Sequence, residues 1–245
     1  MNARSGAKIG VLVPFTNTNL EPDMMAMCPP GATLHFARLG GYDVDEIPGA
    51  DQMAGLGATD MSDALRLIAG VRPSVVLYGC TSATLTHGAD FDRELAASIK
   101  KTSGAVSLTA ASSLVAALNA LNARRIGFAS PYVGEINNLA VKFLAAAGIE
   151  VAKVSDIGRD LGNYGQSELT PDDVFELAIQ ADARDLDAIV LSCTDMRSVE
   201  AIERIEAANR KPVVASNQAM IFCAMKALGL KPDGRQPGRL FDRIQ

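Results

Sequence analysis

The chain has 245 residues, of which 48% are hydrophobic and 21% are charged, and it contains no tryptophan. This composition is typical of a globular protein with a sizeable core and excludes a largely disordered chain. The net charge of −5 at pH 7 comes from interspersed acidic and basic residues without a basic block, so neither a nucleic acid nor a membrane is expected as a partner.

Short apolar runs alternate with amphipathic stretches along almost the whole chain. Strands are predicted over residues 9–13, 75–78, 126–129, 151–154, 188–191 and 213–215, and helices over residues 63–69, 91–101, 112–122, 135–147, 171–181, 198–208 and 219–228. The strand runs are continuously apolar rather than alternating, which is typical of strands buried on both faces of a parallel sheet. The sequence therefore predicts an α/β fold with crossover helices between parallel strands.

The clearest helix boundaries lie in the motifs "LTPDD" and "AAAGIEV". Thr170 has the side chain of an N-cap, Pro171 suits the first helical position, and the two aspartates that follow face the positive end of the helix dipole. Gly148 is expected to end a helix directly before the next strand.

One pattern occurs in both halves of the chain. The stretch "KIGVLVPFTN" at residues 8–17 is echoed by "RIGFASPYVGEIN" at 125–137, and each is followed later by an apolar run that ends in Cys-Thr. This order predicts two pseudosymmetric Rossmann-like halves, residues 1–110 plus 216–245 and residues 111–215. Because open α/β sheets bind ligands at the carboxyl ends of their strands, the active site is expected in the cleft between the halves.

The two Cys-Thr loops carry the chemistry that the sequence predicts. Cys80 in "VVLYGCTSAT" and Cys193 in "AIVLSCTDMR" each follow a buried strand and precede a helical turn, where backbone N–H groups favour a thiolate and bind anions. Thr81, Ser82 and Thr194 add hydroxyl donors that suit a carboxylate. A single cysteine at a strand end is commonly a small core residue, but the repeated context favours a catalytic pair.

The remaining cysteines and histidines have simpler interpretations. Cys28 and Cys223 are expected to pack, and His35 is expected on a strand or at the surface. His87 follows Cys80 closely enough to leave a Cys–His nucleophile as an alternative, although nothing in "TLTHGAD" directs the ring toward the sulfur.

The spacing of these residues excludes the common metal motifs, because the chain has no CxxC or HxxxH pattern. No apolar stretch is long enough to span a bilayer, and the first residues lack the pattern of a secretory signal. Four cysteines without such a signal predict reduced thiols in a cytoplasmic protein.

The two Cys-Thr loops, "VLVPFTNTNLEPDM", "ASPYVGEIN" and the closing "PGRLF" resemble the aspartate/glutamate racemase superfamily, and within it the maleate cis-trans isomerases. The resemblance covers essentially the whole chain and implies two facing α/β halves, a homodimer, and Cys80 and Cys193 as the catalytic cysteines. It also implies that Asn17, Tyr132 and Asn163 contact the substrate. From the residues alone, Asn17 could instead cap a turn and Tyr132 could pack, although the position of each at a strand end favours the cleft, and Asn163 is equally suited to a left-handed turn position.

The reaction implied by this resemblance is the isomerisation of maleate to fumarate without a metal, nucleotide or flavin. Cys80 would add to the alkene as a thiolate, and Cys193 would protonate the neighbouring carbon. Arylmalonate decarboxylases, which are close relatives, keep a single cysteine at the second position, so two thiols argue against a decarboxylase. A cofactor-independent racemase or epimerase of an α-substituted acid and a non-catalytic carboxylate-binding protein remain alternatives. Asp195 and Arg197, beside the second cysteine, are positions that could alter the choice of a small dicarboxylate substrate.

Overall fold

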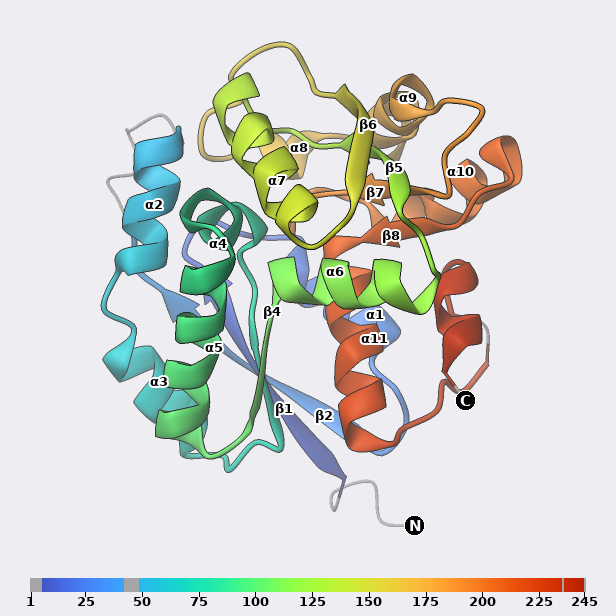
Figure 1. Ribbon diagram of the computed structural model, residues 1–245. Helices are drawn as coiled ribbons and strands as arrows, with labels where there is room; N and C mark the ends of the chain where they lie inside the picture. Colours follow the sequence, from blue (N-terminus) through green and yellow to red (C-terminus); the bar gives the residue numbers. More distant parts are fainter. Residues whose placement is uncertain (1–5, 42–48, 235, 245) are drawn as a thin grey trace.

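The chain forms two four-stranded parallel sheets with the same internal strand order (Figure 1). The structure, a computed structural model, describes residues 6–41, 49–234 and 236–244. The first sheet has the order β2-β1-β3-β4 and the second has the order β6-β5-β7-β8. The predicted α/β class with two pseudosymmetric halves is therefore confirmed.

The strands are β1 (Ala7–Pro14), β2 (Ala32–Leu39), β3 (Val75–Tyr78), β4 (Val106–Thr109), β5 (Arg125–Ala129), β6 (Glu150–Ser155), β7 (Ala188–Leu191) and β8 (Val213–Ala215). The α-helices are α1 (Leu20–Met27), α2 (Ala50–Ala58), α3 (Ser62–Ala69), α4 (Thr81–His87), α5 (Ala89–Ser103), α6 (Ala110–Ala120), α7 (Gly134–Ala146), α8 (Gly165–Glu168), α9 (Pro171–Ala181), α10 (Ile202–Asn209) and α11 (Ser216–Leu228). Two 3₁₀ turns, η2 (Val199–Ala201) and η3 (Arg239–Arg243), complete the described elements.

The six predicted strands are all present, but β2 and β4 escaped prediction. Both lie at an edge of the first sheet, where a strand is only partly covered. Their side chains are mostly half-buried or exposed, so their sequences "ATLHFARL" and "VSLT" mix polar and apolar residues. An apolar run therefore marks all four central strands and also the edge strands β6 and β8 of the second sheet, but it is missing from the edge strands β2 and β4 of the first sheet.

The seven predicted helices are also present, with small shifts at their ends. The N-cap of α9 is as expected, because the Thr170 side chain accepts a hydrogen bond from the Asp173 N–H and Pro171 occupies the first turn. The helix predicted at 198–208 begins as the 3₁₀ turn η2. Helices α1, α2, α4 and α8 are short and were not predicted as separate helices.

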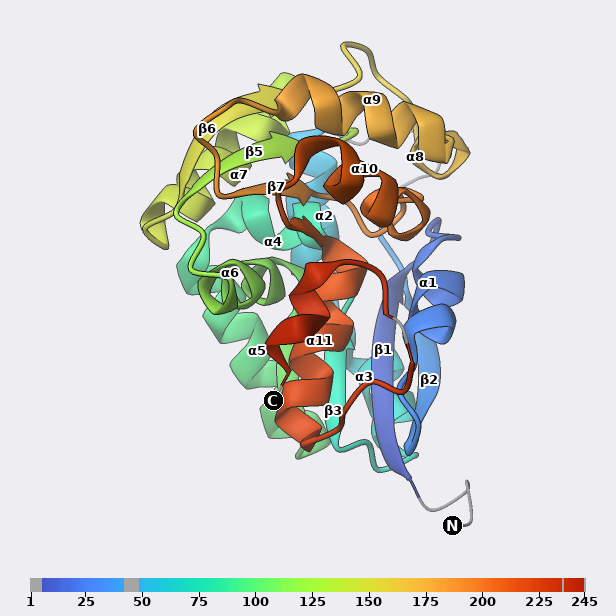
Figure 2. The same cartoon turned by 90° about the vertical axis from the view of Figure 1, so that its right-hand side faces the viewer.

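Helices α6 and α11 join the two sheets. Each follows the last strand of its own sheet and contacts the last strands of both sheets, and the two helices pack against one another (Figure 2). Leu114 of α6 and Phe222 of α11 belong to one apolar cluster that includes residues of both sheets, such as Val11 and Phe128. Because the two halves share this core, it does not divide the chain into separate units. The predicted boundaries of the halves, after residues 110 and 215, therefore remain a prediction.

Within the described ranges, no helix combines the length and apolar character needed to cross a membrane.

Gly127 is expected to be essential for the packing of the second sheet. It lies in β5, and a Cβ added there would stand 2.3 Å from the Ala181 carbonyl oxygen at the end of α9. Gly127→Ala should therefore lower the free energy of unfolding in urea by about 1–3 kcal/mol, because the backbone at Ala181 or in β5 would have to move to relieve this contact. The matched control is Gly134→Ala in the first turn of α7, where no atom lies within 4 Å of the added Cβ. Equal effects of the two substitutions would contradict this account.

Candidate active site

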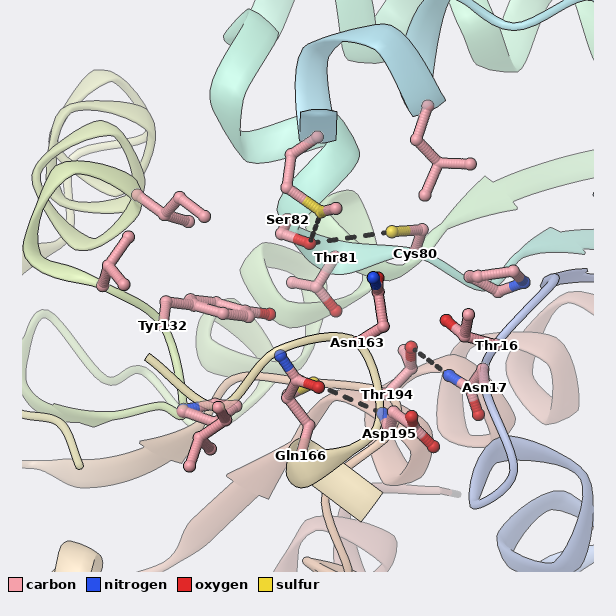
Figure 3. Close-up of a pocket in the computed structure, with 18 of the residues that line it drawn as sticks. Thr16, Asn17, Cys80, Thr81, Ser82, Tyr132, Asn163, Gln166, Thr194 and Asp195 are labelled. Atoms are coloured by element: carbon pink, nitrogen blue, oxygen red, sulfur yellow. Dashed lines mark hydrogen bonds between the residues drawn. The ribbon is translucent and has the colours of Figure 1, made fainter. Parts of the chain in front are cut away.

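The loops that follow β1, β3, β5 and β7 converge on one pocket (Figure 3). All eight residues predicted for the site line this pocket: Asn17, Cys80, Thr81, Ser82, Tyr132, Asn163, Cys193 and Thr194. The pocket therefore brings together side chains from both sheets, as expected for ligand sites at the carboxyl ends of parallel strands.

Cys80 lies at the junction between β3 and α4. Its backbone is extended, so it serves as the N-cap residue of α4, and its side chain is buried with 5% exposure. Burial raises the pKa of this thiol, whereas the Ala83 N–H and the Ser82 hydroxyl and N–H act in the opposite direction. The Ser82 Oγ lies 3.7 Å from the sulfur and donates a hydrogen bond to the Met53 Sδ. Cys80 is thus a buried thiol with donors arranged to receive a negative charge.

Cys193 occupies the corresponding position after β7 but has a different electrostatic environment. Its pKa is raised well above the usual range of a thiol, first by burial and then by the Asp195 carboxylate. The Asp195 backbone N–H donates to the Cys193 sulfur at 3.3 Å. The charge with the largest effect on Cys193 therefore opposes a thiolate, so Cys80 is the better placed of the two sulfurs to ionise.

Asn17 and Thr194 connect the two halves of the site. The Asn17 Nδ2 donates to the Thr194 Oγ1 at 2.9 Å, and this hydroxyl donates in turn to the Gly79 carbonyl oxygen at 2.8 Å. The Asn17 Oδ1 also accepts from the backbone N–H groups of Asn19 and Leu20. Asn17 thus holds its own turn, as one sequence interpretation expected, and at the same time lines the pocket.

Asp195 reinforces the same connection. Its Oδ1 accepts from the N–H groups of Thr18 at 2.8 Å and Asn19 at 3.0 Å, and the Asn19 side chain donates to the Asp195 carbonyl oxygen. Burial raises the pKa of this carboxyl to about 6. The sequence indicated that Asp195 could alter substrate choice, but it did not predict that hydrogen bonds of Asp195 link the two halves.

Thr81, Tyr132 and Asn163 occupy the remaining predicted places. The Thr81 hydroxyl donates to the Ser216 Oγ at the start of α11, and Tyr132 directs its hydroxyl toward the centre of the pocket (Figure 3). The pKa of Tyr132 is raised well above its usual range, mainly by burial and then by Cys193. Asn163 precedes α8; the residue with a left-handed backbone in "LGNYG" is Gly162, with φ of 64°, and not Asn163.

Several pocket residues were not predicted. Thr16, Gln166 and Asp160 add polar groups, and an apolar wall is formed by Pro14, Met53, Leu56, Pro131, Val133, Ile136 and Leu161. The apolar members resemble ordinary core residues in the sequence, so no local pattern distinguished them. Among the described residues, no Lys, Arg or His lines the pocket, and no cluster of acidic, Cys or His side chains has the geometry of a metal site.

The other cysteines and histidines lie away from the pocket. His87 bonds through Nε2 to the Ala54 carbonyl oxygen and stacks on Phe91, so the alternative Cys80–His87 dyad is not formed. Cys223 is buried in α11 and Cys28 ends α1, which agrees with the packing roles expected for both. His35 lies on β2.

The family of this chain follows from comparison with known proteins. The family described as arylmalonate decarboxylase matches residues 9–241. The chain belongs to this family. The resemblance seen in the sequence, to arylmalonate decarboxylases and maleate isomerases together, is confirmed.

Members of both kinds are among the relatives. The chain is 27% identical to a maleate isomerase of Pseudomonas putida, over 92% of this chain and 93% of that protein. It is 30% identical to an arylmalonate decarboxylase of Bordetella bronchiseptica, over 69% of this chain and 71% of that protein. A solved structure of a Nocardia farcinica maleate cis-trans isomerase mutant, with a covalently bound succinylcysteine intermediate, has a TM-score of 0.87 at 23% identity and covers 96% of this chain and 98% of that chain. This last likeness establishes the fold of the family member described here.

The two pocket thiols are expected to differ in reactivity in this arylmalonate decarboxylase family member. Since burial raises both pKa values, alkylation by iodoacetamide should accelerate about tenfold per pH unit from about pH 7 to 8.5. Cys80 should react faster than Cys193 because burial and the Asp195 carboxylate together raise the pKa of Cys193 well above the usual range of a thiol. Mass spectrometry of the labelled peptides measures each site separately, with Cys223 as the buried thiol outside the pocket. A rate that is flat over this pH range would show that a thiolate already exists at neutral pH.

Proposed function

We propose that this protein isomerises maleate to fumarate by covalent addition and elimination, without a cofactor. The observation that carries the proposal is the presence of two thiols, Cys80 and Cys193, from corresponding loops of the two halves in one pocket. The maleate isomerases among its relatives, and the cysteine adduct named for one of them, support the same reaction.

The first half of the reaction uses both thiols. Cys80, as a thiolate, forms a bond to one alkene carbon of maleate, and the π electrons move toward the other carbon. Cys193 supplies the proton that this second carbon takes up and becomes a thiolate itself. The product is a succinyl thioether on Cys80, in which the former double bond is a single bond.

The second half reverses these steps after a rotation. The carbon–carbon single bond turns, Cys193 removes the proton, the double bond re-forms, and the carbon–sulfur bond to Cys80 breaks. Fumarate leaves, and both sulfurs return to their starting protonation states. No atom or electron is needed from outside the pocket and the substrate.

We assign the substrate carboxylates to neutral donors. Asn17, Thr81, Ser82, Tyr132, Asn163 and Thr194 line the pocket and carry amide or hydroxyl groups. Negative charge grows on one carboxylate during addition, and hydrogen-bond donors in a buried site stabilise such charge. The Thr81, Ser82 and Thr194 hydroxyls already donate within the protein and would have to turn toward the substrate, whereas Asn17 keeps one amide hydrogen beyond its bond to Thr194. This assignment does not require a cationic side chain.

A reducing compartment suits this chemistry, because the mechanism needs both thiols free and the described cysteines form no disulfide. We therefore infer a cytoplasmic location. A homodimer, which the family resemblance implies, is also part of the proposal, and light scattering of the purified protein tests it.

The direct test is to follow maleate and fumarate by proton NMR. The wild-type protein should convert maleate to fumarate, and Cys80→Ser and Cys193→Ser should each lower kcat at least about 1000-fold because each removes a reacting group. Cys193→Ser incubated with maleate should retain a succinyl adduct on Cys80, detected by intact and peptide mass spectrometry.

The control is Cys28→Ser, which removes a thiol outside the pocket and should leave kcat within about twofold. If both pocket variants keep full activity, the two-thiol mechanism is wrong.

Two other reactions define the alternative outcomes. Loss of carbon dioxide from phenylmalonate would favour the arylmalonate decarboxylase activity named for another relative. Exchange of an α-proton of an amino acid in deuterated water, with maleate inert, would favour a racemase. Neither reaction would be accompanied by a succinyl adduct on Cys80.

A further inference from the structure

Asp195 makes three connections that no other pocket residue combines in the described part of the chain. Its backbone N–H donates to the Cys193 sulfur at 3.3 Å. Its carboxylate accepts from two successive N–H groups, those of Thr18 and Asn19, in the loop that follows β1. Its carbonyl oxygen accepts from the Asn19 side chain at 3.0 Å. One residue of the second half thus links a reacting sulfur to the loop that carries Asn17.

The Asp195 carboxylate is also a charged group in a site that is largely shielded from water. The Asp195 side chain is buried, with 8% exposure, and Cys193 is buried to the same extent. Charges interact strongly where water is excluded, so the Asp195 carboxylate disfavours a second negative charge on the neighbouring sulfur. Asp195 also raises the pKa of Cys80, but there burial, the Ala83 N–H and the Ser82 hydroxyl have larger effects.

We propose that Asp195 is a positioning residue with two tasks: its carboxylate fixes the Asn17 loop against the Cys193 loop, and its charge makes Cys193 the acid of the pair and leaves Cys80 as the nucleophile. The second task rests on the proposed function, whereas the first does not. The arrangement gives two sulfurs in matching loops unequal roles.

The titratable and charged groups that face Asp195 include both anionic and cationic side chains. Cys193 adjoins it in the same loop, Cys80 faces it from the β3–α4 loop, Asp23 from α1 and Arg38 from β2. Arg38 is the cation of this set, and it also donates to the Asn17 carbonyl oxygen at 2.7 Å. The ionised carboxylate therefore has one stabilising charge and two N–H donors, which favour its charged form near neutral pH.

The test separates the charge from the hydrogen bonds. In Asp195→Asn, the amide oxygen can accept the same two N–H groups, but the charge is gone. In Asp195→Ala, both are lost. Alkylation of Cys193 at pH 8, read by peptide mass spectrometry, should be at least about threefold faster in both variants than in the wild type. The ratio should approach one as the pH falls through about 6, where the wild-type carboxyl takes up a proton.

The kinetic constants with maleate give the second measurement. Asp195→Asn should move the alkaline limb of the kcat profile to lower pH, because Cys193 then loses its proton more easily, and should leave KM within about threefold. Asp195→Ala should in addition raise KM about tenfold or more, because the Asn17 loop loses its anchor. A merely structural role would lower kcat and raise KM in both variants without moving the pH profile.

Asp187 supplies a matched control. Its Oδ2 accepts from the successive N–H groups of Arg124 and Arg125, both at 2.8 Å, and it lies outside the pocket. Asp187→Asn and Asp187→Ala should change neither the alkylation of Cys193 nor the pH profile.

The outcomes distinguish this proposal from the proposed function. Unchanged Cys193 alkylation in Asp195→Asn would overturn the electrostatic task, and an unchanged KM in Asp195→Ala would overturn the anchoring task. If maleate is not a substrate, the proposed function fails, but the alkylation rates still test Asp195. In that case, equal urea unfolding of Asp195→Ala and Asp195→Asn would overturn the anchoring task.

Discussion

The site depends on a short chain of buried hydrogen bonds that crosses from one sheet to the other. Asn17 bonds to Thr194, Thr194 bonds to Gly79, and Asp195 accepts from the turn that follows Asn17. The bonds of Thr194 to Asn17 and Gly79 are buried, so breaking one of them leaves a partner that costs about 1–3 kcal/mol to bury unpaired, and the bonds of Asp195 to the turn are part-buried. The two cysteine loops can therefore hold a fixed separation although they belong to different halves of the fold.

Electrostatic asymmetry follows from that geometry. The two thiols occupy equivalent strand ends, but donors surround Cys80 and a carboxylate adjoins Cys193. The pocket lining in the described ranges adds the acidic Asp160 and no cation, and its other polar groups are amides and hydroxyls. Such a site suits chemistry in which charge develops only transiently, and the proposed reaction uses its two identical thiols as nucleophile and acid.

Some elements of this fold have a clear pattern in the sequence, and others do not. The central strands β1, β3, β5 and β7 were predictable because strands buried on both faces must be apolar throughout. Cys80 and Cys193 could be placed together because each follows a central strand of its own half, and the repeated order predicted that the two halves face each other at these strand ends. The edge strands β2 and β4 lacked this signal, and the apolar pocket wall of Met53 and Leu56 is indistinguishable from core in sequence.

By itself, the sequence determined the α/β class, the duplication and the two cysteines that line the pocket, since these depend on local pattern and residue chemistry. Only the tertiary structure decided that Asn17 both holds its turn and reaches Thr194, that His87 faces Ala54 instead of Cys80, and that Asp195 links the halves. The reason is physical. Hydrogen bonds between residues about 177 positions apart, and the pKa of a thiol beside a buried carboxylate, depend on distances and burial that exist only after the chain has folded.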